Sequence, residues 1–226
     1  ARHHGLAPAA LSYHDHNEVE RTAALLERLR AGDDVALVSD AGTPLISDPG
    51  FRLIAAAHEA GIPVVPVPGP CAAIAALSVA GLPSDRFVFQ GFPPAKAAAR
   101  RAWLEALRHE TGTMIFYESP HRIQECLADL CDVFGADRRA LFARELTKQF
   151  ETLRAESLGV LRDWVARDPD QSRGEIVLVV AGAVAPEAQA LTADQERLLR
   201  LLLNEMPPSR AAALVAEYAG LKRSQV

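Results

Sequence analysis

Short apolar runs alternate along the chain with longer amphipathic stretches, and this alternation predicts an α/β fold. Continuous apolar runs bounded by turn residues indicate buried strands, whereas apolar residues at three- and four-residue spacing indicate helices. We expect strands over residues 35–39, 62–67, 87–90, 113–117, 140–144, 150–154 and 175–180. We expect helices over residues 51–60, 71–79, 97–109, 119–134 and 158–167.

The last part of the chain has a different pattern. Residues 181–193 are rich in Ala, Pro and Glu, which is typical of a linker. Leucines at helical spacing over 194–205, and a Pro-Pro-Ser start before 210–219, predict two further helices, the second ending at Gly220. A basic segment follows, so the order is typical of part of a helix-turn-helix module. The run of turn formers over 81–85 predicts a domain boundary.

Composition narrows the class of protein. The 226 residues are 49% hydrophobic and 23% charged, which is typical of a globular enzyme of one large or two modest domains. The net charge of -5 argues against a dedicated nucleic-acid binder, although a local basic patch can lie on an acidic molecule. The three cysteines lack CxxC spacing, which indicates neither a disulfide framework nor a zinc site and favours the reducing cytoplasm. No apolar run is of membrane-spanning length and no signal peptide is recognisable, so we expect a cytoplasmic protein without a membrane partner.

The segment from Ser39 to Gly50 is the most informative motif. It follows a predicted strand, at the end where open α/β sheets bind ligands. Gly42 permits a close backbone approach and Pro44 stiffens the loop, whose N–H groups can hold a carboxylate. Asp40 or Asp48 can accept a bond from an ammonium or a hydroxyl. A rigid strand-to-helix turn capped by Asp48 explains the same residues, and the pattern alone leaves both interpretations open.

A second rigid turn, Pro68-Gly69-Pro70, leads into a predicted helix through Cys71 and Ala72. Small residues there let a ligand approach the helix start, but a tightly packed βα turn is the favoured interpretation of this motif taken alone. No base neighbours Cys71 in the sequence. We therefore expect a small buried thiol rather than a nucleophile.

A third motif at residues 116–122 is dense in polar and titratable groups for a structural turn. Phe116 or Tyr117 could face an adenine, Glu118 could accept a hydrogen bond, and His121 and Arg122 could contact phosphate. Alternatively, the Ser-Pro pair after Glu118 starts a helix whose first turn exposes His121 and Arg122 to solvent. The residues favour neither interpretation.

Two charged segments and several missing motifs complete the analysis. The segment Arg144–Glu151 joins two predicted strands and suits a solvated hairpin. Lys96, Arg100, Arg101 and Arg108 lie along one predicted helix, where a solvated face is more usual than a stripe that contacts phosphate. The sequence has no GxGxxG after a strand, no P-loop and no HExxH, which disfavours dinucleotide-binding, nucleotide-triphosphate and zinc-protease classes.

Taken together and in order, the motifs resemble those of a known family. They are similar to those of bacterial 16S ribosomal RNA 2′-O-ribose cytidine methyltransferases, which belong to the tetrapyrrole methylase superfamily. Besides the three motifs above, the resemblance rests on His-Asp-His-Asn-Glu at 14–18, Gly-Leu-Pro-Ser-Asp-Arg-Phe at 81–87, Gly-Phe-Pro-Pro-Ala-Lys at 91–96, Ala-Arg-Glu-Leu-Thr-Lys at 143–148 and Gly-Glu-Ile-Val-Leu at 174–178. It covers about residues 11–182.

The resemblance implies an α/β fold with two domains of the tetrapyrrole methylase type, the cofactor between them, and a small helical C-terminal module. It implies methylation of a cytidine ribose 2′-hydroxyl in 16S ribosomal RNA of the small subunit, with S-adenosyl-L-methionine as cofactor and a homodimer as the assembly. The cofactor residues implied are Asp40, Ala41, Gly42, Thr43, Pro44, Pro68, Gly69, Cys71, Ala72, Phe116, Tyr117, Gly174 and Glu175.

A ribose hydroxyl is a weak nucleophile at neutral pH, so a base or a stabilising cation is expected beside it. By chemistry and motif position the candidates for this role are Glu145, Lys148 and Glu118, with His121 as a further one. No metal-ligand cluster is evident. The candidates for contact with RNA are Lys96, Arg100, Arg101, His121, Arg122 and Arg144.

The chain departs from the family at its start, where the family has a first strand and a cofactor loop. We therefore interpret residues 1–81 as the remnant of an N-terminal α/β domain, 82–182 as a second α/β domain, and 183–226 as a linker with a partial helix-turn-helix-like module. A chain without that loop is expected to bind the cofactor weakly. Two alternatives are a small-molecule methyltransferase acting on a tetrapyrrole, which the acidic charge favours slightly, and a non-catalytic RNA-binding or assembly factor.

Overall fold

The computed structural model describes residues 10–14, 16–184 and 191–221. The chain divides into two compact units, Ala1–Gly182 and Ala183–Val226. In the described residues no helix combines the length and the apolar character that crossing a membrane requires. The division of the first unit at residue 81 stays a prediction.

The first unit is built on one mixed sheet of five strands in the order β1-β2-β5-β3-β4. Its strands β1 and β2 are parallel, and the other neighbouring pairs are antiparallel. Because β5 lies between β2 and β3, the end of β2, the start of β5 and the end of β3 meet at one end of the sheet. The strands are β1 (Phe87–Gly91), β2 (Thr113–Glu118), β3 (Arg139–Arg144), β4 (Thr152–Ser157) and β5 (Ile176–Val180).

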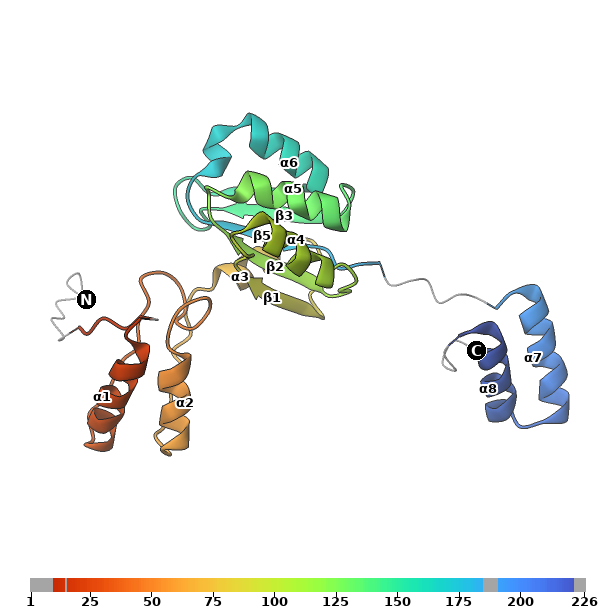
Figure 1. The fold of residues 1–226 in the computed structure, drawn as a ribbon, viewed down its shortest axis with the longest axis horizontal. Coiled ribbons are helices and arrows are strands. Elements are labelled where there is room, and N and C mark those ends of the chain that lie inside the picture. The colour runs from red at the N-terminus through yellow and green to blue at the C-terminus, as the bar shows by residue number, and fades with distance from the viewer. Residues whose placement is uncertain (1–9, 15, 185–190, 222–226) are drawn as a thin grey trace. The chain divides into compact units, whose positions relative to one another are not determined.

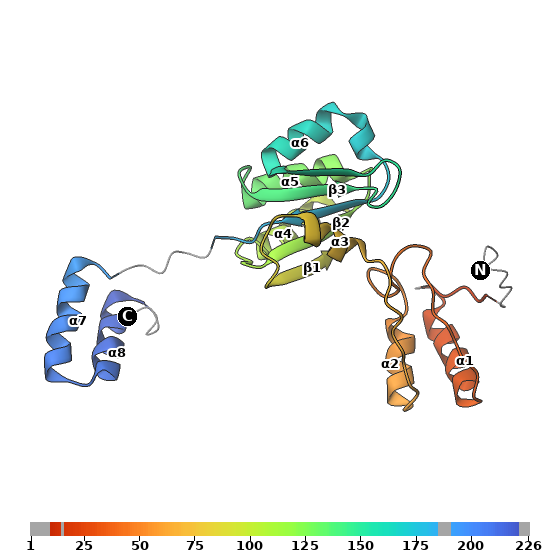
Figure 2. The ribbon, with the colours of Figure 1, turned by 180° about the vertical axis from the view of Figure 1, so that it is seen from behind.

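Helices cover both faces of the sheet (Figures 1 and 2). One face packs on α4 (Ala97–Ala106), α5 (Ile123–Phe134) and α6 (Leu158–Arg167), and the other packs on α3 (Ala72–Val79). Strand side chains alternate between the faces. Met114 and Phe116 therefore enter the core under α4–α6, whereas Ile115 and Tyr117 face α3.

The part of the chain before α3 contains α1 (Glu18–Arg30), which the sequence analysis did not anticipate, and α2 (Phe51–Glu59). The two expected strands at 35–39 and 62–67 are wrong, because neither segment forms a strand. A strand requires a neighbour to satisfy its backbone groups, and neither segment has such a neighbour among the described residues. Val38, Val65 and Val67 are accordingly about four-fifths exposed, at 81%, 79% and 84%.

Most other expected elements are confirmed, with shifted ends that have local causes. The helix expected from residue 119 begins at Ile123, because Ser119–Arg122 forms a turn closed by a 3.1 Å bond from the Arg122 N–H to the Ser119 carbonyl. The strand expected from 150 begins at Thr152, opposite Arg144, because the intervening residues form a turn. The helix α4 ends at Ala106 rather than at 109.

The second unit consists of α7 (Ala193–Glu205) and α8 (Pro208–Ala219), and both expected helices are confirmed. A capping box starts α7: the Thr192 hydroxyl accepts from the Gln195 backbone N–H, and the Gln195 side-chain Oε1 accepts from the Thr192 backbone N–H. Gly220 ends α8 in the left-handed conformation, with φ of 66°. The expected basic segment at 222–226 lies outside the described residues.

Candidate functional site

A cavity of about 400 Å³ opens where β2 ends and β5 begins. This volume is within the range of roughly 300–1,000 Å³ typical of small-molecule sites. Its walls come from four places: the loop after residue 40, the start of α3, the ends of β1 and β2, and the start of β5. The lining residues are Ala41, Gly42, Thr43, Ile46, Ser47, Asp48, Cys71, Ala72, Phe92, Tyr117, Glu118, Ser119, Pro120, Gly174, Glu175, Ile176 and Val177.

The structure brings most of the predicted cofactor residues together in this wall, namely Ala41, Gly42, Thr43, Cys71, Ala72, Tyr117, Gly174 and Glu175. Asp40, Pro44, Pro68 and Gly69 lie beside these residues in the chain but outside the wall. Phe116 is a correction, because its ring is fully buried in the core under α4–α6. Strand alternation points the neighbouring Tyr117 to the cavity side instead.

Several wall residues were missed as cofactor residues: Ile46, Ser47, Phe92, Ser119, Pro120, Ile176 and Val177. All of them lie inside or next to a motif that the sequence analysis singled out. Apolar residues such as Val177 carry no chemical signal, since the same residue type fills the core. Phe92 carried the clearest sequence signal, as the aromatic residue of the motif at 91–96. In the structure it is half-exposed, and its ring centroid is 5.7 Å from that of Tyr117.

The loop at residues 39–50, which forms one wall of the cavity, has a strained backbone. Leu45 and Ser47 have positive φ, at 72° and 59°, a conformation that costs non-glycine residues about 1–3 kcal/mol each. The Thr43 hydroxyl donates a 2.9 Å bond to the Pro70 carbonyl and so ties this loop to the second rigid turn. Strain of this kind clusters at ligand sites, which supports the functional interpretation of the motif at 39–50.

Tyr117 joins β2 to the start of α3. Its hydroxyl oxygen accepts a 3.1 Å bond from the Ala73 N–H in the first turn of that helix. Its ring packs edge-on against Phe89 and Phe92. Burial, followed by the nearby Cys71 thiol, raises the pKa of Tyr117 to about 12, so the phenol stays neutral at physiological pH.

Glu118 is buried, and its carboxylate is engaged within the protein. Its Oε1 accepts from the Ser119 N–H at 2.7 Å and from the Arg122 guanidinium at 2.6 Å. Its Oε2 has no hydrogen-bond partner among the described residues and is shielded from solvent. Burial, followed by the charge of Glu118, raises the pKa of the Cys126 thiol well above its usual value. The carboxylate thus fixes Arg122 and the turn before α5.

Three charged side chains form what we call the rim network: Glu175 lines the cavity, and Glu145 and Lys148 are bonded to Glu175 from outside the lining. The Lys148 ammonium donates to Glu145 Oε1 and to Glu175 Oε2, both at 2.9 Å. Glu145 Oε1 also accepts from the Glu175 N–H at 2.9 Å, so it fixes the backbone of a wall residue. A Cβ on Gly174 would lie 2.5 Å from the Glu145 carboxyl carbon, so a larger residue at 174 would displace that carboxylate.

The hydrogen bonds of this network set its charge. The N–H of Glu175, followed by Lys148, lowers the pKa of Glu145. Hydrogen bonds to Glu145 and Glu175 raise the pKa of Lys148. At neutral pH the network is therefore one ammonium between two carboxylates. Glu145 (φ 50°) and Thr147 (φ 64°) adopt the left-handed conformation, so this turn is strained as well.

The predicted RNA contacts of Arg100 and Arg144 are corrected, because both side chains are buried. Arg100 is 1% exposed and donates a 2.6 Å bond to Asp129, while Arg144 is 8% exposed and donates to Gln171 and Thr152. A guanidinium buried in this way cannot contact RNA without leaving its partners.

The side chains of the other predicted RNA contacts differ in whether they are bonded within the protein. Arg101 is exposed but bonded to Asp129 and Asp132, so the arginines of α4 form largely an ion-pair network rather than a stripe that contacts phosphate. Arg122 is paired with Glu118. Lys96 and His121 are exposed.

Comparison with known proteins agrees with this geometry. The family model described as Tetrapyrrole (Corrin/Porphyrin) Methylases matches residues 3–162, and the model described as RsmI C-terminal HTH domain matches residues 189–226. The ribosomal RNA small subunit methyltransferase I of Pseudomonas aeruginosa is 56% identical over 99% of this chain and 79% of its own length. The protein of that name from Escherichia coli O157:H7 is 50% identical over 99% of this chain and 78% of its own length.

Among solved structures, uroporphyrin-III C-methyl transferase from Thermus thermophilus, complexed with S-adenyl homocysteine, matches with a TM-score of 0.51. It is 19% identical and the match covers 80% of each chain, so it supports the fold alone. The family models and the close relatives go further than the fold. The chain belongs to the ribosomal RNA small subunit methyltransferase I family of tetrapyrrole methylases.

Proposed function

We propose that this chain transfers a methyl group from S-adenosyl-L-methionine to the 2′-hydroxyl of a cytidine ribose in 16S ribosomal RNA of the small subunit. The observation that carries the proposal is the cavity of about 400 Å³, whose walls combine the three main motifs of the sequence with Phe92 and residues 174–177 from two further motifs. The names of the relatives, which specify small-subunit ribosomal RNA, support the substrate class. The match of residues 189–226 to a helix-turn-helix model agrees with a nucleic-acid substrate.

The cavity suits the proposed cofactor. S-adenosyl-L-methionine combines an apolar adenine face with a cationic sulfonium, an ammonium, a carboxylate and a ribose diol. The wall offers apolar surface from Ile46 and Val177, two carboxylates from Asp48 and Glu175, and backbone at Gly42 that a ligand can approach closely. When bound, the cofactor supplies an electrophilic methyl group.

The rim network suits the chemical step. The ribose oxygen forms the new bond to the methyl carbon, the carbon–sulfur bond breaks, and the hydroxyl proton passes to a carboxylate or water. Lys148, held as an ammonium, stabilises the negative charge that develops on the ribose oxygen. Glu145 is a positioning residue that holds Lys148 and the Glu175 backbone. Glu118 acts from inside the wall by fixing Arg122, rather than as a base.

Lys96 and His121 remain candidates for contact with RNA, since both are exposed. We propose in addition that the protein is a homodimer and acts in the cytoplasm, where ribosomal subunits are assembled. A tetrapyrrole substrate is the second candidate, favoured only by the acidic net charge of -5. A non-catalytic RNA-binding or assembly role is the third, and methyl transfer separates it from the other two.

The test is methyl transfer from methyl-labelled cofactor to 30S subunits that lack the modification, with the Pseudomonas aeruginosa relative as a positive control. Nucleoside mass spectrometry is expected to find the label on a cytidine ribose. The variant Lys148→Met is expected to lower kcat by about 10²–10⁴, the range of a group that acts in the transition state, while the cofactor Kd measured by calorimetry changes little.

Arg108→Gln is the matched control, because Arg108 also forms an i,i+3 ion pair with a glutamate but lies just after α4 and does not line the cavity. It is expected to leave kcat and Kd unchanged. If cofactor binds without transfer to any RNA, the assembly-factor role replaces this proposal. If label enters uroporphyrin instead, the tetrapyrrole role replaces it. Wild-type turnover in Lys148→Met removes Lys148 from the mechanism.

A further inference from the structure

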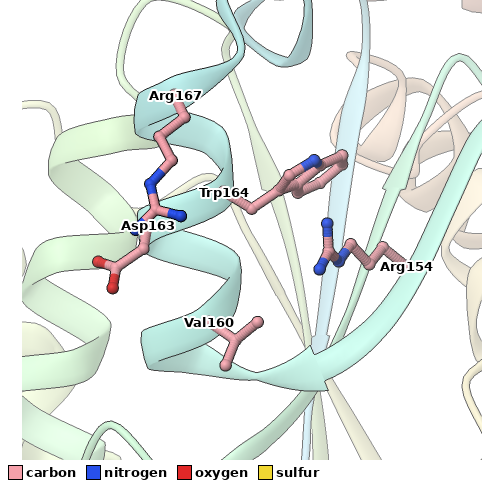
Figure 3. A pocket seen from close by; sticks show the side chains of 5 residues that line it. All are labelled: Arg154, Val160, Asp163, Trp164 and Arg167. Carbon is pink, nitrogen blue, oxygen red and sulfur yellow. The ribbon is translucent and has the colours of Figure 1, made fainter.

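A second cavity, of about 330 Å³, lies between β4 and α6 and shares no residue with the first (Figure 3). It is lined by Arg154, Val160, Asp163, Trp164 and Arg167. Because β4 is the edge strand of the sheet, this cavity is at the side of the first unit. We call it the Arg154–Arg167 groove.

Among the described residues, the two arginines of the groove are not paired with carboxylates, unlike the arginines of α4. Arg154 and Arg167 have no carboxylate within ion-pair distance in the part of the chain that the structure describes. The carboxylate of Asp163, the acidic member of the lining, is bonded to Arg162 at 2.9 Å from Nε and 2.8 Å from Nη2. Most other arginines of this unit, Arg100 and Arg101 among them, are paired with acidic groups. Both guanidiniums of the groove are thus available for an external anion.

The aromatic partner gives the groove a defined geometry. The Arg154 guanidinium carbon lies 4.8 Å from the centroid of the Trp164 ring. Figure 3 shows Arg154 extending from the strand toward the helix, with Arg167 on the helix itself. Trp164 is held in place by an edge-on contact with the buried Phe142, at 5.3 Å between centroids. A guanidinium stacked on a ring keeps its N–H edge free, and that edge matches phosphate in a two-pronged bond.

The groove and the cofactor cavity lie on opposite faces of the same sheet: Trp164 packs on Phe142 in the core under α4–α6, whereas the cavity wall includes Tyr117 on the α3 face. Strand pairing gives their separation along the sheet. Thr152 at the start of β4 pairs with Arg144, which pairs with Ile176 in the cavity wall. Arg154 is two residues further along, and β2 is three strands away, which is about 14 Å at the usual strand spacing of ~4.8 Å. The helix α6 follows β4 and runs back along it, so that Arg167 at its C-terminal end lies toward the same end of the sheet.

We propose that the Arg154–Arg167 groove binds the phosphate backbone of the substrate RNA, in a part of the RNA that passes round the β4 edge of the sheet from the nucleotide that is methylated. The inference rests on the proposed function, because it requires RNA as the substrate. Arg154 and Arg167 each hold a phosphate, and Trp164 fixes the orientation of Arg154. The contact is independent of base sequence, so the groove supplies affinity and positioning rather than nucleotide choice.

The test measures the salt dependence of binding between a labelled single-stranded fragment of 16S RNA and the whole chain. Arg154→Gln and Arg167→Gln are each expected to reduce the slope of log K against log salt by about 0.7, the value for one phosphate contact on a single strand, and the double variant by about 1.4. Arg154→Lys, which keeps the positive charge, is expected to have the same slope as the wild type.

Arg108→Gln and Arg173→Gln are the controls, since both remove exposed arginines that are already paired with carboxylates, and their slopes should equal that of the wild type. A wild-type slope in the double variant, or an equal decrease in the controls, overturns the inference. Arg167→Gln leaves the Arg154–Trp164 contact intact, so that its result is independent of any loss of packing. Methyl transfer by the wild type tests the proposed function separately, since it does not depend on the slope.

Discussion

Asp129 is the residue on which the packing of α4 against α5 depends. Its carboxylate accepts from both Arg100 and Arg101, and Arg100 is 1% exposed. Burial acts to lower the pKa of Arg100, but hydrogen bonding to Asp129 and the charge of that carboxylate act together against it. The net pKa of Arg100 is raised, so this guanidinium stays charged inside the protein. A sequence shows two adjacent arginines, but only the fold reveals that one of them faces inward.

We expect Asp129→Ala to lower the free energy of unfolding of the first unit by about 3–5 kcal/mol, because it leaves the buried charge of Arg100 without its main partner. Urea denaturation followed by tryptophan fluorescence would measure the change. Asp132→Ala is the matched control: Asp132 is 61% exposed and its single contact with Arg101 is 3.4 Å long, so its effect should be within about 0.5 kcal/mol. Equal effects of the two variants would contradict the structural role given to Asp129.

Among the elements, the turn between β3 and β4 combines strain and charge. Glu145 and Thr147 have positive φ, and Lys148 lies between two carboxylates. The lowered pKa of Glu145 means that its stabilising contribution is present above its ordinary value of 4.5 and is lost as the pH falls through the lowered value. The raised pKa of Lys148 means that its contribution is present below 10.5 and is lost as the pH rises through the raised value.

We therefore expect the stability of the first unit to be insensitive to this network between about pH 5 and pH 10, and to fall outside that range. Thermal denaturation over pH would measure it. Tyr117 contributes to the alkaline decrease as well, since its pKa is raised from 10.0 to about 12 and its stabilising effect is lost as the pH rises through that range. The variants Tyr117→Phe and Lys148→Met separate the two contributions. An alkaline decrease that survives in the double variant would rule out both groups as its cause.

The sequence predicted elements well where a local pattern determines them, as at α6 and β5, and poorly where a partner determines them. The segments 35–39 and 62–67 have the composition of strands, but no ladder forms there. The candidate site was predictable in its motifs, because glycines and prolines mark the rigid loops. Features that depend on side-chain alternation or on contact between distant elements were not predictable. They are the inward direction of Phe116, the burial of Arg144, and the groove formed by Arg154 across two elements.

For the whole molecule, the two units have separate cores. Both core clusters of the first unit consist of residues before 183, and Ala211, Val215 and Ala216 are buried within the second unit. The first unit also contains every residue of both cavities. We therefore expect the first unit to hold the cofactor site and the proposed RNA groove, and the second unit to add RNA contacts.

We expect a chain ending at residue 182 to bind S-adenosyl-L-methionine with the same Kd as the full chain and to bind the 16S RNA fragment more weakly, because it lacks the helix-turn-helix match. Calorimetry measures the first quantity and a filter-binding titration the second. Unchanged RNA affinity would show that the first unit carries all of the RNA contacts. Lost cofactor binding, in a chain whose circular dichroism is unchanged, would show that the second unit contributes to the cofactor site.

The left-handed residues around the cavity have a consequence for protein engineering. Ser47 and Thr147 occupy a conformation that glycine adopts at little cost, so a programme that selects for thermostability would tend to replace them with glycine. The same replacements would allow the loop and the turn more conformations before the ligand arrives. Selection for heat resistance and selection for catalysis would therefore favour different amino acids at these two positions.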